Sequence, residues 1–250
     1  MARNATDRRL FWEGCHNVRD LGGMPTFRGS PTRFGAVVRA DNPGALTQRG
    51  VTALLEHGVS TIIDLRNMTE RVATGDASRR LAESSGLSYA HLPLLGNAGR
   101  DTFALLSRSK STVDTYRVLL EACHREIATV FATIAGANPG GVLVHCQAGR
   151  DRTGIVSALL LAAAGVPSGV VAEDYRLSAR YLAPLYARYV ECASSAEERA
   201  ALLRENRSEP SDMLSTLALL HDEHGGIEGY LLAAGLARTE LDGAVSRLFD

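Results

Sequence analysis

The chain has 250 residues, enough for one large domain or two small ones. Hydrophobic residues make up 45% and charged residues 22% of it. This balance is typical of a globular protein and excludes a disordered chain, a collagen-like repeat and a disulfide scaffold. The formal net charge is −1, so no general basic field draws the chain onto nucleic acid.

The start of the chain, MARNATDRRLFWEG, has neither the apolar segment nor the small-residue cleavage site of a signal peptide. The longest apolar stretch, 155–172, is interrupted by Gly165 and Pro167, and its continuous part is far shorter than the roughly 20 residues that span a bilayer. The four cysteines lie far apart, without the C-x-x-C pairs of a zinc site. We therefore expect a cytoplasmic protein with no membrane span.

Apolar runs predict four strands: Phe34–Ala40, Ser60–Leu65, Ser88–Leu92 and Val142–Val144. Thr47 can cap a helix over 48–57 that stops at Gly58. Apolar residues at steps of three and four predict one long helix from Thr112 to Ala135. The short, continuous run at 142–144 is typical of a strand that is buried on both faces of a parallel sheet. Strands that alternate with helices indicate an α/β architecture.

After residue 166 only helical patterns follow: Val170–Arg176, Tyr181–Cys192, Ala196–Glu205, Asp212–His224, Ile227–Ala234 and Thr239–Phe249. In the last of them, Thr239 and Asp242 resemble a capping box. The C-terminal third is therefore predicted to be all-helical. No linker-like segment precedes it, so we expect a single domain over 1–250.

The segment VLVHCQAGRDRTG, residues 142–154, combines a buried strand, a tight loop and the start of a helix. Here the backbone N–H groups of residues 147–152 can surround a tetrahedral oxyanion, and the helix dipole adds to their effect. Arg152 can clamp two oxygens of that anion, while the same positive field favours a thiolate at Cys146. His145 and Cys146 are neighbours on a strand and point to opposite faces, which excludes a shared metal ion. The pattern predicts a phosphate held over a nucleophilic sulfur.

The sequence HCQAGRDRTG at 145–154 resembles the phosphate-binding loop of the cysteine-dependent phosphatases. It is most similar to the HC-x-AGKDRTG form found in the bacterial, atypical tyrosine-phosphatase family. Five further segments resemble that family: NVRDLGG (17–23), VVRAD (37–41), IIDLRNMTE (62–70), VVAEDY (170–175) and GGIEGYLLAAGL (225–236). The resemblance implies the cysteine-phosphatase-like fold, which is a central, mainly parallel sheet flanked by helices.

The resemblance also implies the roles of the loop residues. Cys146 would be the nucleophile that takes the phosphoryl group as a thiophosphate, and Arg152 would bind that group. Thr153 would help the thiolate to leave in the hydrolytic step, and His145 would tune the thiolate through backbone hydrogen bonds. The backbone of Gln147, Ala148, Gly149 and Arg150 would complete the phosphate site, without a metal ion or other cofactor.

The general acid is less well defined by the sequence. Some members of the family use an aspartate just after the strand that corresponds to Ser88–Leu92, where this chain has Gly96. Asp151, inside the loop motif, is the favoured acid, although it could instead be a structural partner for a nearby arginine. Asp64 and Asp101 are alternatives, as is a site with no dedicated acid.

Supporting residues are expected on both sides of the loop. Asn17, Arg19 and Asp20 match a family motif near it and are expected to brace it by hydrogen bonds. Asp64 is expected to join Arg66 and Glu70 in an internal ion-pair network. Arg150, where the family usually has lysine, could bind a second anionic group of the substrate or be a solvated charge.

Three functions follow from these residues. The first is a tyrosine-phosphatase-like enzyme, of single or dual specificity, that acts on phosphotyrosine in proteins. The second is the same chemistry on a small metabolite, such as a nucleotide, a sugar phosphate or an inositol phosphate. The third, a phosphate-binding module without catalysis, is disfavoured by the intact Cys146, Arg152 and Thr153. The expected partner in each case is a phosphate monoester.

Overall fold

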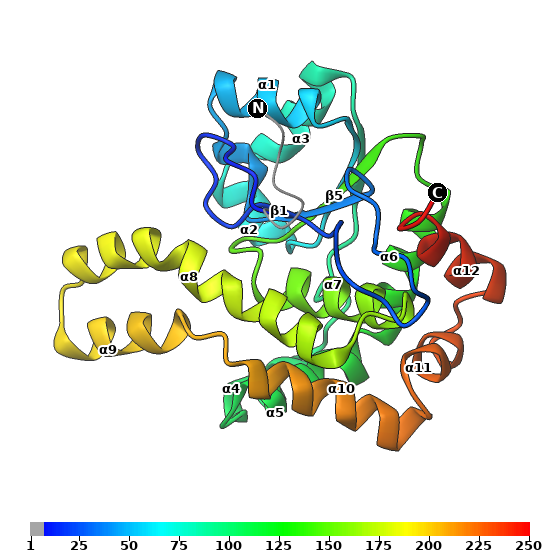
Figure 1. Ribbon diagram of the computed structural model, residues 1–250. Helices are drawn as coiled ribbons and strands as arrows, with labels where there is room; N and C mark the ends of the chain where they lie inside the picture. Colours follow the sequence, from blue (N-terminus) through cyan, green and yellow to red (C-terminus); the bar gives the residue numbers. More distant parts are fainter. Residues whose placement is uncertain (1–7) are drawn as a thin grey trace.

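The computed structural model describes residues 8–250. Part of the N-terminal segment that lacks a signal-peptide pattern, residues 1–7, therefore lies outside the described residues. The five strands are β1 (Arg19–Asp20), β2 (Val37–Ala40), β3 (Val59–Asp64), β4 (Ser88–His91) and β5 (Gly141–His145). They form one sheet in the order β1-β2-β5-β3-β4 (Figure 1), in which only β1 runs antiparallel to its neighbour. The predicted mainly parallel sheet is confirmed.

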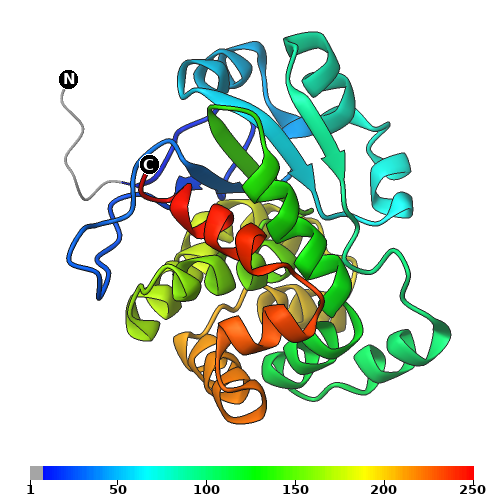
Figure 2. The ribbon, with the colours of Figure 1, turned by 90° about the vertical axis from the view of Figure 1, so that its right-hand side faces the viewer.

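Helices cover both faces of this sheet, as Figures 1 and 2 show. Successive residues of a strand point to opposite faces, so Leu143 of β5 packs with α1 (Gln48–Glu56) and α3 (Ala77–Ser85). Its neighbours Val142 and Val144 join the larger core on the other side, with α5 (Thr112–Ala122), α6 (His124–Gly136) and α7 (Asp151–Ala163). Every residue of β5 is buried, which explains its continuous apolar run.

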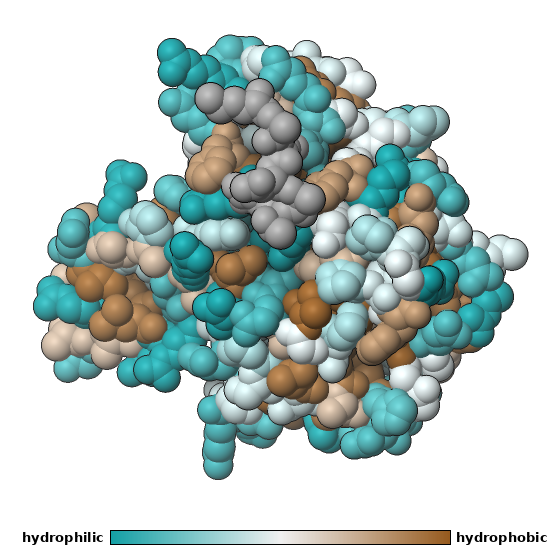
Figure 3. Space-filling view, in the orientation of Figure 1, coloured by the Kyte–Doolittle hydropathy of each residue, from teal (hydrophilic) through white to brown (hydrophobic). Residues whose placement is uncertain are grey.

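The chain after residue 166 is helical throughout, as predicted. Its helices are α8 (Ser168–Cys192), α9 (Ala196–Glu205), α10 (Pro210–His224), α11 (Ile227–Ala233) and α12 (Arg238–Ser246). The antiparallel α8 and α9 project at the left of Figure 1, and Figure 3 shows hydrophobic residues gathered at the end of this pair. Within residues 8–250, no helix is both long enough and apolar enough to cross a membrane.

Several element boundaries differ from the sequence prediction. The helix predicted from Thr112 to Ala135 is two helices, because Cys123, at φ −115° and ψ 19°, interrupts it. The two helices predicted over 170–192 are instead the single helix α8, which continues through Pro184. The prediction of a capping box at Thr239 and Asp242 is wrong. The helix is capped two residues earlier, at Ala237, whose backbone N–H donates to the Glu240 side chain.

Five short elements were not predicted. They are β1, the 3₁₀ turn Pro43–Ala45, α2 (Met68–Ala73), α3 and α4 (Arg100–Arg108). The helix α2 has only six residues but begins with a full capping box, in which Asn67 and Glu70 each accept the other's backbone N–H. Such short elements depend on caps and packing more than on a hydrophobic period.

The carboxylate of Asp174 attaches α8 to the sheet. It accepts hydrogen bonds from Arg8 at 2.7 Å, Arg19 at 3.0 Å and Arg39 at 2.8 Å. Burial alone would raise the pKa of Asp174, but the three guanidinium groups hold that pKa well below its usual range. Burial and the charge of Arg39 lower the pKa of Arg19 to about 10, so Arg19 stays charged at neutral pH. The cluster therefore contains three positive charges and one negative charge.

We predict that Asp174→Asn lowers the free energy of unfolding at pH 7 by about 3–5 kcal/mol, because it leaves buried arginines without their counter-charge. The pKa of Asp174 is lower in the folded chain than in the unfolded chain, so the ionised carboxylate stabilises the fold at pH values above the unfolded pKa of about 4. This stabilisation is lost progressively as the pH falls from that value toward the folded pKa. The difference between the parent and the variant should therefore shrink from pH 7 to pH 3 in urea titrations. Asp242→Asn, at an exposed position, is the control. A loss of stability that is equal at both pH values would contradict this account.

Candidate active site

The loop of residues 146–150 lies at the carboxyl ends of the parallel strands. Cys146 follows β5 directly, and α7 begins at Asp151. Its neighbours in the sheet, β2 and β3, end beside it at Ala40 and Asp64. In open α/β sheets this edge is where ligands bind. The predicted order of strand, loop and helix is confirmed.

The carbonyl oxygens of the loop are held away from its centre by three groups on other segments. The contacts are Asn42 N–H to Gln147 O at 3.1 Å, Asn17 Nδ2 to Ala148 O at 3.0 Å and to Gly149 O at 3.1 Å, and Arg39 Nη2 to Gly149 O at 2.8 Å. In a planar trans peptide the N–H points opposite to the C=O. The following N–H groups are therefore turned toward the centre of the loop. Within residues 8–250, the backbone N–H groups of 147–152 have no protein acceptor.

Gly149 is required by the shape of this loop. Its φ of +66° lies in the left-handed region, and a Cβ there would come within 2.3 Å of the Ala40 carbonyl oxygen. A side chain would therefore both strain the backbone and collide with β2.

Arg152 is held in place by Glu70 of α2. Its Nη1 and Nη2 donate to the two carboxylate oxygens of Glu70, each at 2.6 Å, in a bidentate pair. Burial opposes the charge, but Glu70 and the neighbouring Cys146 and Asp151 raise the pKa of Arg152 above its usual range. Arg152 is therefore a fixed and permanently charged group at the helix start.

Cys146 and two other predicted residues, His145 and Thr153, are buried at the loop. Cys146 is only 2% exposed. Burial lowers the pKa of His145 to about 4, so its ring is neutral at neutral pH, and Nδ1 lies 3.1 Å from the Cys146 carbonyl oxygen, to which it must donate. Thr153 is fully buried, and its hydroxyl oxygen has no hydrogen-bond partner among the described residues.

Asp151 and Arg150 form an ion pair at the loop mouth. Arg150 Nε and Nη2 lie 3.0–3.2 Å from the carboxylate oxygens, which is the arginine partnership expected as the alternative role for Asp151. The Asp151 side chain is 36% exposed, whereas that of Arg150 is 12% exposed. Arg150 Nη1 is buried with no partner in the described part of the chain. Arg150 is thus not a solvated charge.

Of the three residues predicted to support the loop by hydrogen bonds, Asn17 and Arg19 do so and Asp20 does not. Asn17 reaches the loop directly, and Arg19 holds the Asn17 side chain by a hydrogen bond from its Nη1. Asp20 does not reach the loop, because neighbouring strand residues point to opposite sides. Its carboxylate accepts instead from the Gly35 N–H and lies 2.7 Å from His57 Nε2.

Asp64 is buried beside the loop. It pairs with Arg66, accepts from the Tyr89 hydroxyl, and lies 3.6 Å from His145 Nε2. Burial would raise the pKa of Asp64, but the hydrogen bonds and the charge of Arg66 hold that pKa well below its usual range, so Asp64 is a structural anion. Asp101 is exposed in the first turn of α4 and makes no hydrogen bond or ion pair with the loop, both being among the described residues.

The sequence prediction missed three groups at the site. Glu70 was assigned to an internal network rather than to Arg152, although the spacing of Asn67 and Glu70 already marks a capping box. Arg39 was not considered as a loop partner. Tyr116 was read only as an apolar helix position, but its hydroxyl donates to Asp151 Oδ1 at 2.8 Å.

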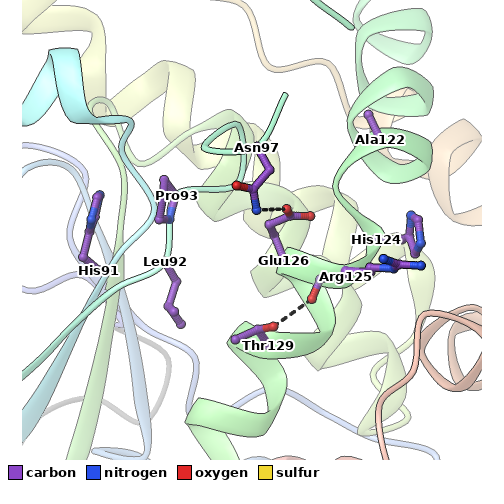
Figure 4. Close-up of a pocket in the computed structure, with 9 residues that line it drawn as sticks. All are labelled: His91, Leu92, Pro93, Asn97, Ala122, His124, Arg125, Glu126 and Thr129. Atoms are coloured by element: carbon purple, nitrogen blue, oxygen red, sulfur yellow. Dashed lines mark hydrogen bonds between the residues drawn. The ribbon is translucent and has the colours of Figure 1, made fainter. Parts of the chain in front are cut away.

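A cavity of about 520 Å³ lies elsewhere, beside the carboxyl end of β4. It is lined by His91, Asn97 and the start of α6, and Figure 4 shows Asn97 directed toward Glu126. None of the predicted catalytic residues lines this cavity. Within residues 8–250, no cluster of three or more His, Cys, Asp or Glu side chains could hold a metal ion.

A family model described as the tyrosine phosphatase family matches residues 10–250. The chain belongs to the tyrosine phosphatase family. It is 30% identical over 239 residues to a tyrosine-protein phosphatase of Nostoc commune, covering 90% of this chain and 78% of that protein. It is 24% identical over 269 residues to the triple specificity protein phosphatase PtpB of Mycobacterium tuberculosis, covering 92% and 95%. The chain is therefore a phosphatase, and the predicted family and fold class are confirmed.

We predict that Glu70→Gln lowers kcat/KM for p-nitrophenyl phosphate on the order of 10²-fold, the cost typical of a misplaced catalytic group. The glutamine can still cap α2 with its one oxygen, but it cannot accept from both terminal nitrogens of Arg152. Glu83→Gln removes the charge of an exposed glutamate that also pairs with an arginine, and it should have no effect. In Glu70→Gln, kcat/KM measured by steady-state kinetics should fall, and inorganic phosphate should bind more weakly. Unchanged kinetics would show that Arg152 does not need this partner.

Proposed function

We propose that this phosphatase hydrolyses phosphate monoesters in two steps, through a thiophosphate on Cys146. The observation that carries the proposal is the ring of inward N–H groups around a cysteine, with Arg152 fixed beside it. Such a ring binds the three non-bridging oxygens of a phosphate monoester, and the charge of Arg152 adds to it.

In the first step the Cys146 thiolate attacks phosphorus and forms an S–P bond as the ester P–O bond breaks. The leaving oxygen takes a proton from the Asp151 carboxyl group. In the second step water attacks phosphorus and gives a proton to the Asp151 carboxylate. The S–P bond then breaks, and its electrons return to sulfur as a thiolate. The unpartnered Thr153 hydroxyl is a suitable hydrogen-bond donor to that sulfur.

The favoured substrate is phosphotyrosine in proteins, in line with the name of the Nostoc commune relative, and the Mycobacterium tuberculosis relative is also named a protein phosphatase. A small phosphorylated metabolite is the alternative. It is supported by Arg150, whose buried Nη1 has no partner within residues 8–250 and could meet a second anionic group. The two substrate classes can be compared by measuring kcat/KM on a panel of phosphopeptides, nucleotides, sugar phosphates and inositol phosphates. Preference for substrates with two anionic groups, lost in Arg150→Met, would support the small molecule.

We predict that Cys146→Ser abolishes turnover of p-nitrophenyl phosphate but still binds inorganic phosphate in calorimetry, because the backbone ring does not depend on the sulfur. Cys192→Ser, which makes the same change at an exposed cysteine, should keep the parent rate. Hydrolysis by Cys146→Ser at a rate close to that of the parent would exclude the thiophosphate mechanism.

We predict that Asp151→Asn lowers the hydrolysis of an alkyl phosphate far more than that of p-nitrophenyl phosphate, since p-nitrophenolate leaves without a proton and an alkoxide does not. General acids typically contribute 10²- to 10⁴-fold, so the difference should be large. Asp101→Asn, at the alternative aspartate on α4, should leave the ratio of the two rates unchanged. Equal losses of Asp151→Asn on both substrates would mean that Asp151 only holds Arg150 and the loop.

A further inference from the structure

A directed chain of hydroxyl groups ends on the Asp151 carboxylate. The Tyr116 hydroxyl lies 2.8 Å from Asp151 Oδ1 and 2.8 Å from the hydroxyl of Tyr175. The three residues come from three helices, α5, α8 and the start of α7. Tyr116 is fully buried and Tyr175 is 1% exposed. The two hydroxyls are therefore shielded from water, and within residues 8–250 their hydrogen-bond partners are each other and Asp151.

The direction of the chain follows from the chemistry of its end. An ionised carboxylate can only accept hydrogen bonds, so the Tyr116 proton must point to Asp151 Oδ1. The Tyr175 hydroxyl must then donate to the Tyr116 oxygen. Burial and the charge of Asp151 raise the pKa of Tyr116 well above its usual value, so Tyr116 remains a donor. Because the Tyr116 oxygen accepts from Tyr175, the Tyr116 hydroxyl keeps its own proton directed at Asp151 Oδ1.

We propose that Tyr116, backed by Tyr175, is a positioning residue that orients the Asp151 carboxyl group for transfer of the catalytic proton. Tyr116 holds Oδ1 from one side, while Arg150 donates from Nε to Oδ1 at 3.2 Å and from Nε and Nη2 to Oδ2 at 3.1 and 3.0 Å, so the two residues together fix the plane of the carboxyl group. The Asp151 side chain is 36% exposed, so the carboxyl group held in this way can meet the leaving group at the loop mouth. The inference rests on the proposed function, in which Asp151 is the general acid.

The hydroxyls contribute little to packing beyond this contact. The rings of Tyr116 and Tyr175 meet edge to face, with centroids 6.0 Å apart, and phenylalanine would keep that arrangement. A buried hydroxyl costs free energy unless it is hydrogen-bonded. The two hydroxyls are satisfied only by each other and by Asp151 among the described residues. Their effect should therefore be seen at Asp151 rather than in stability.

The test is Tyr116→Phe, measured as the ratio of kcat/KM for an alkyl phosphate to that for p-nitrophenyl phosphate. We expect this ratio to fall about 10- to 100-fold, the range for losing a hydrogen bond to a charged group. In the Asp151→Asn background the same substitution should cause no further fall, because Tyr116 acts through that carboxyl group. A merely structural role would lower both rates equally and would add to the effect of Asp151→Asn; either result overturns the proposal.

Two further variants complete the design. Tyr230→Phe removes another buried hydroxyl, which donates to the Leu120 carbonyl oxygen on α5, and should leave the ratio unchanged. Tyr175→Phe frees the Tyr116 oxygen and should lower the ratio by a smaller factor, and it carries the test if Tyr116→Phe does not fold. An unchanged ratio in Tyr175→Phe would then overturn the proposal. If Asp151→Asn itself shows no dependence on the leaving group, the assignment of the acid fails together with this inference. If Asp151→Asn lowers the ratio but the tyrosine variants do not, this inference fails and the assignment of Asp151 as the acid stands.

Discussion

The site depends on one constraint, which is that the loop carbonyl oxygens are bound on the outside of the loop. Peptide planarity converts each outward C=O into an inward N–H, so Asn17, Arg39 and the Asn42 backbone shape the proposed anion site from the outside of the loop. These three groups come from segments more than 100 residues before the loop. The sheet brings them together, since β2 lies directly beside β5. The proposed phosphate site therefore forms only when the sheet has folded.

The same partners give the site its electrostatic character. Arg39 links Gly149 to Asp174, where three arginines share one carboxylate, so uncompensated positive charge is buried behind the loop. Arg152 adds a further charge, which Glu70 balances from the side. In a region of low dielectric such charges act more strongly than in water. A chain with a net charge of −1 can thus offer an anion a locally positive site.

The sequence was sufficient for the parts of this arrangement that are local. The run at 142–154 predicts a strand, a loop and a helix because all three are contiguous and each has its own signal. The partners of the loop could not be predicted in the same way. Glu70 and Arg152 lie 82 positions apart, and nothing in the period or spacing of either segment indicates their contact. Asp20 was assigned to the loop because it belongs to the same motif as Asn17 and Arg19, but the alternation of side chains along β1 turns it toward Gly35.

Asp151 lies where the local and the long-range contacts meet. Its position at the start of α7 follows from the sequence, but its orientation is set by Arg150 beside it and by Tyr116 from α5. Most supporting contacts here, such as those of Asp174, are charged and buried, so removing them disturbs the fold and the site together. A phenol hydroxyl on a packed ring differs, because phenylalanine keeps the packing and loses only the hydrogen bond. The contact between Tyr116 and Asp151 is therefore where orientation of the proposed acid can be separated from stability of the fold.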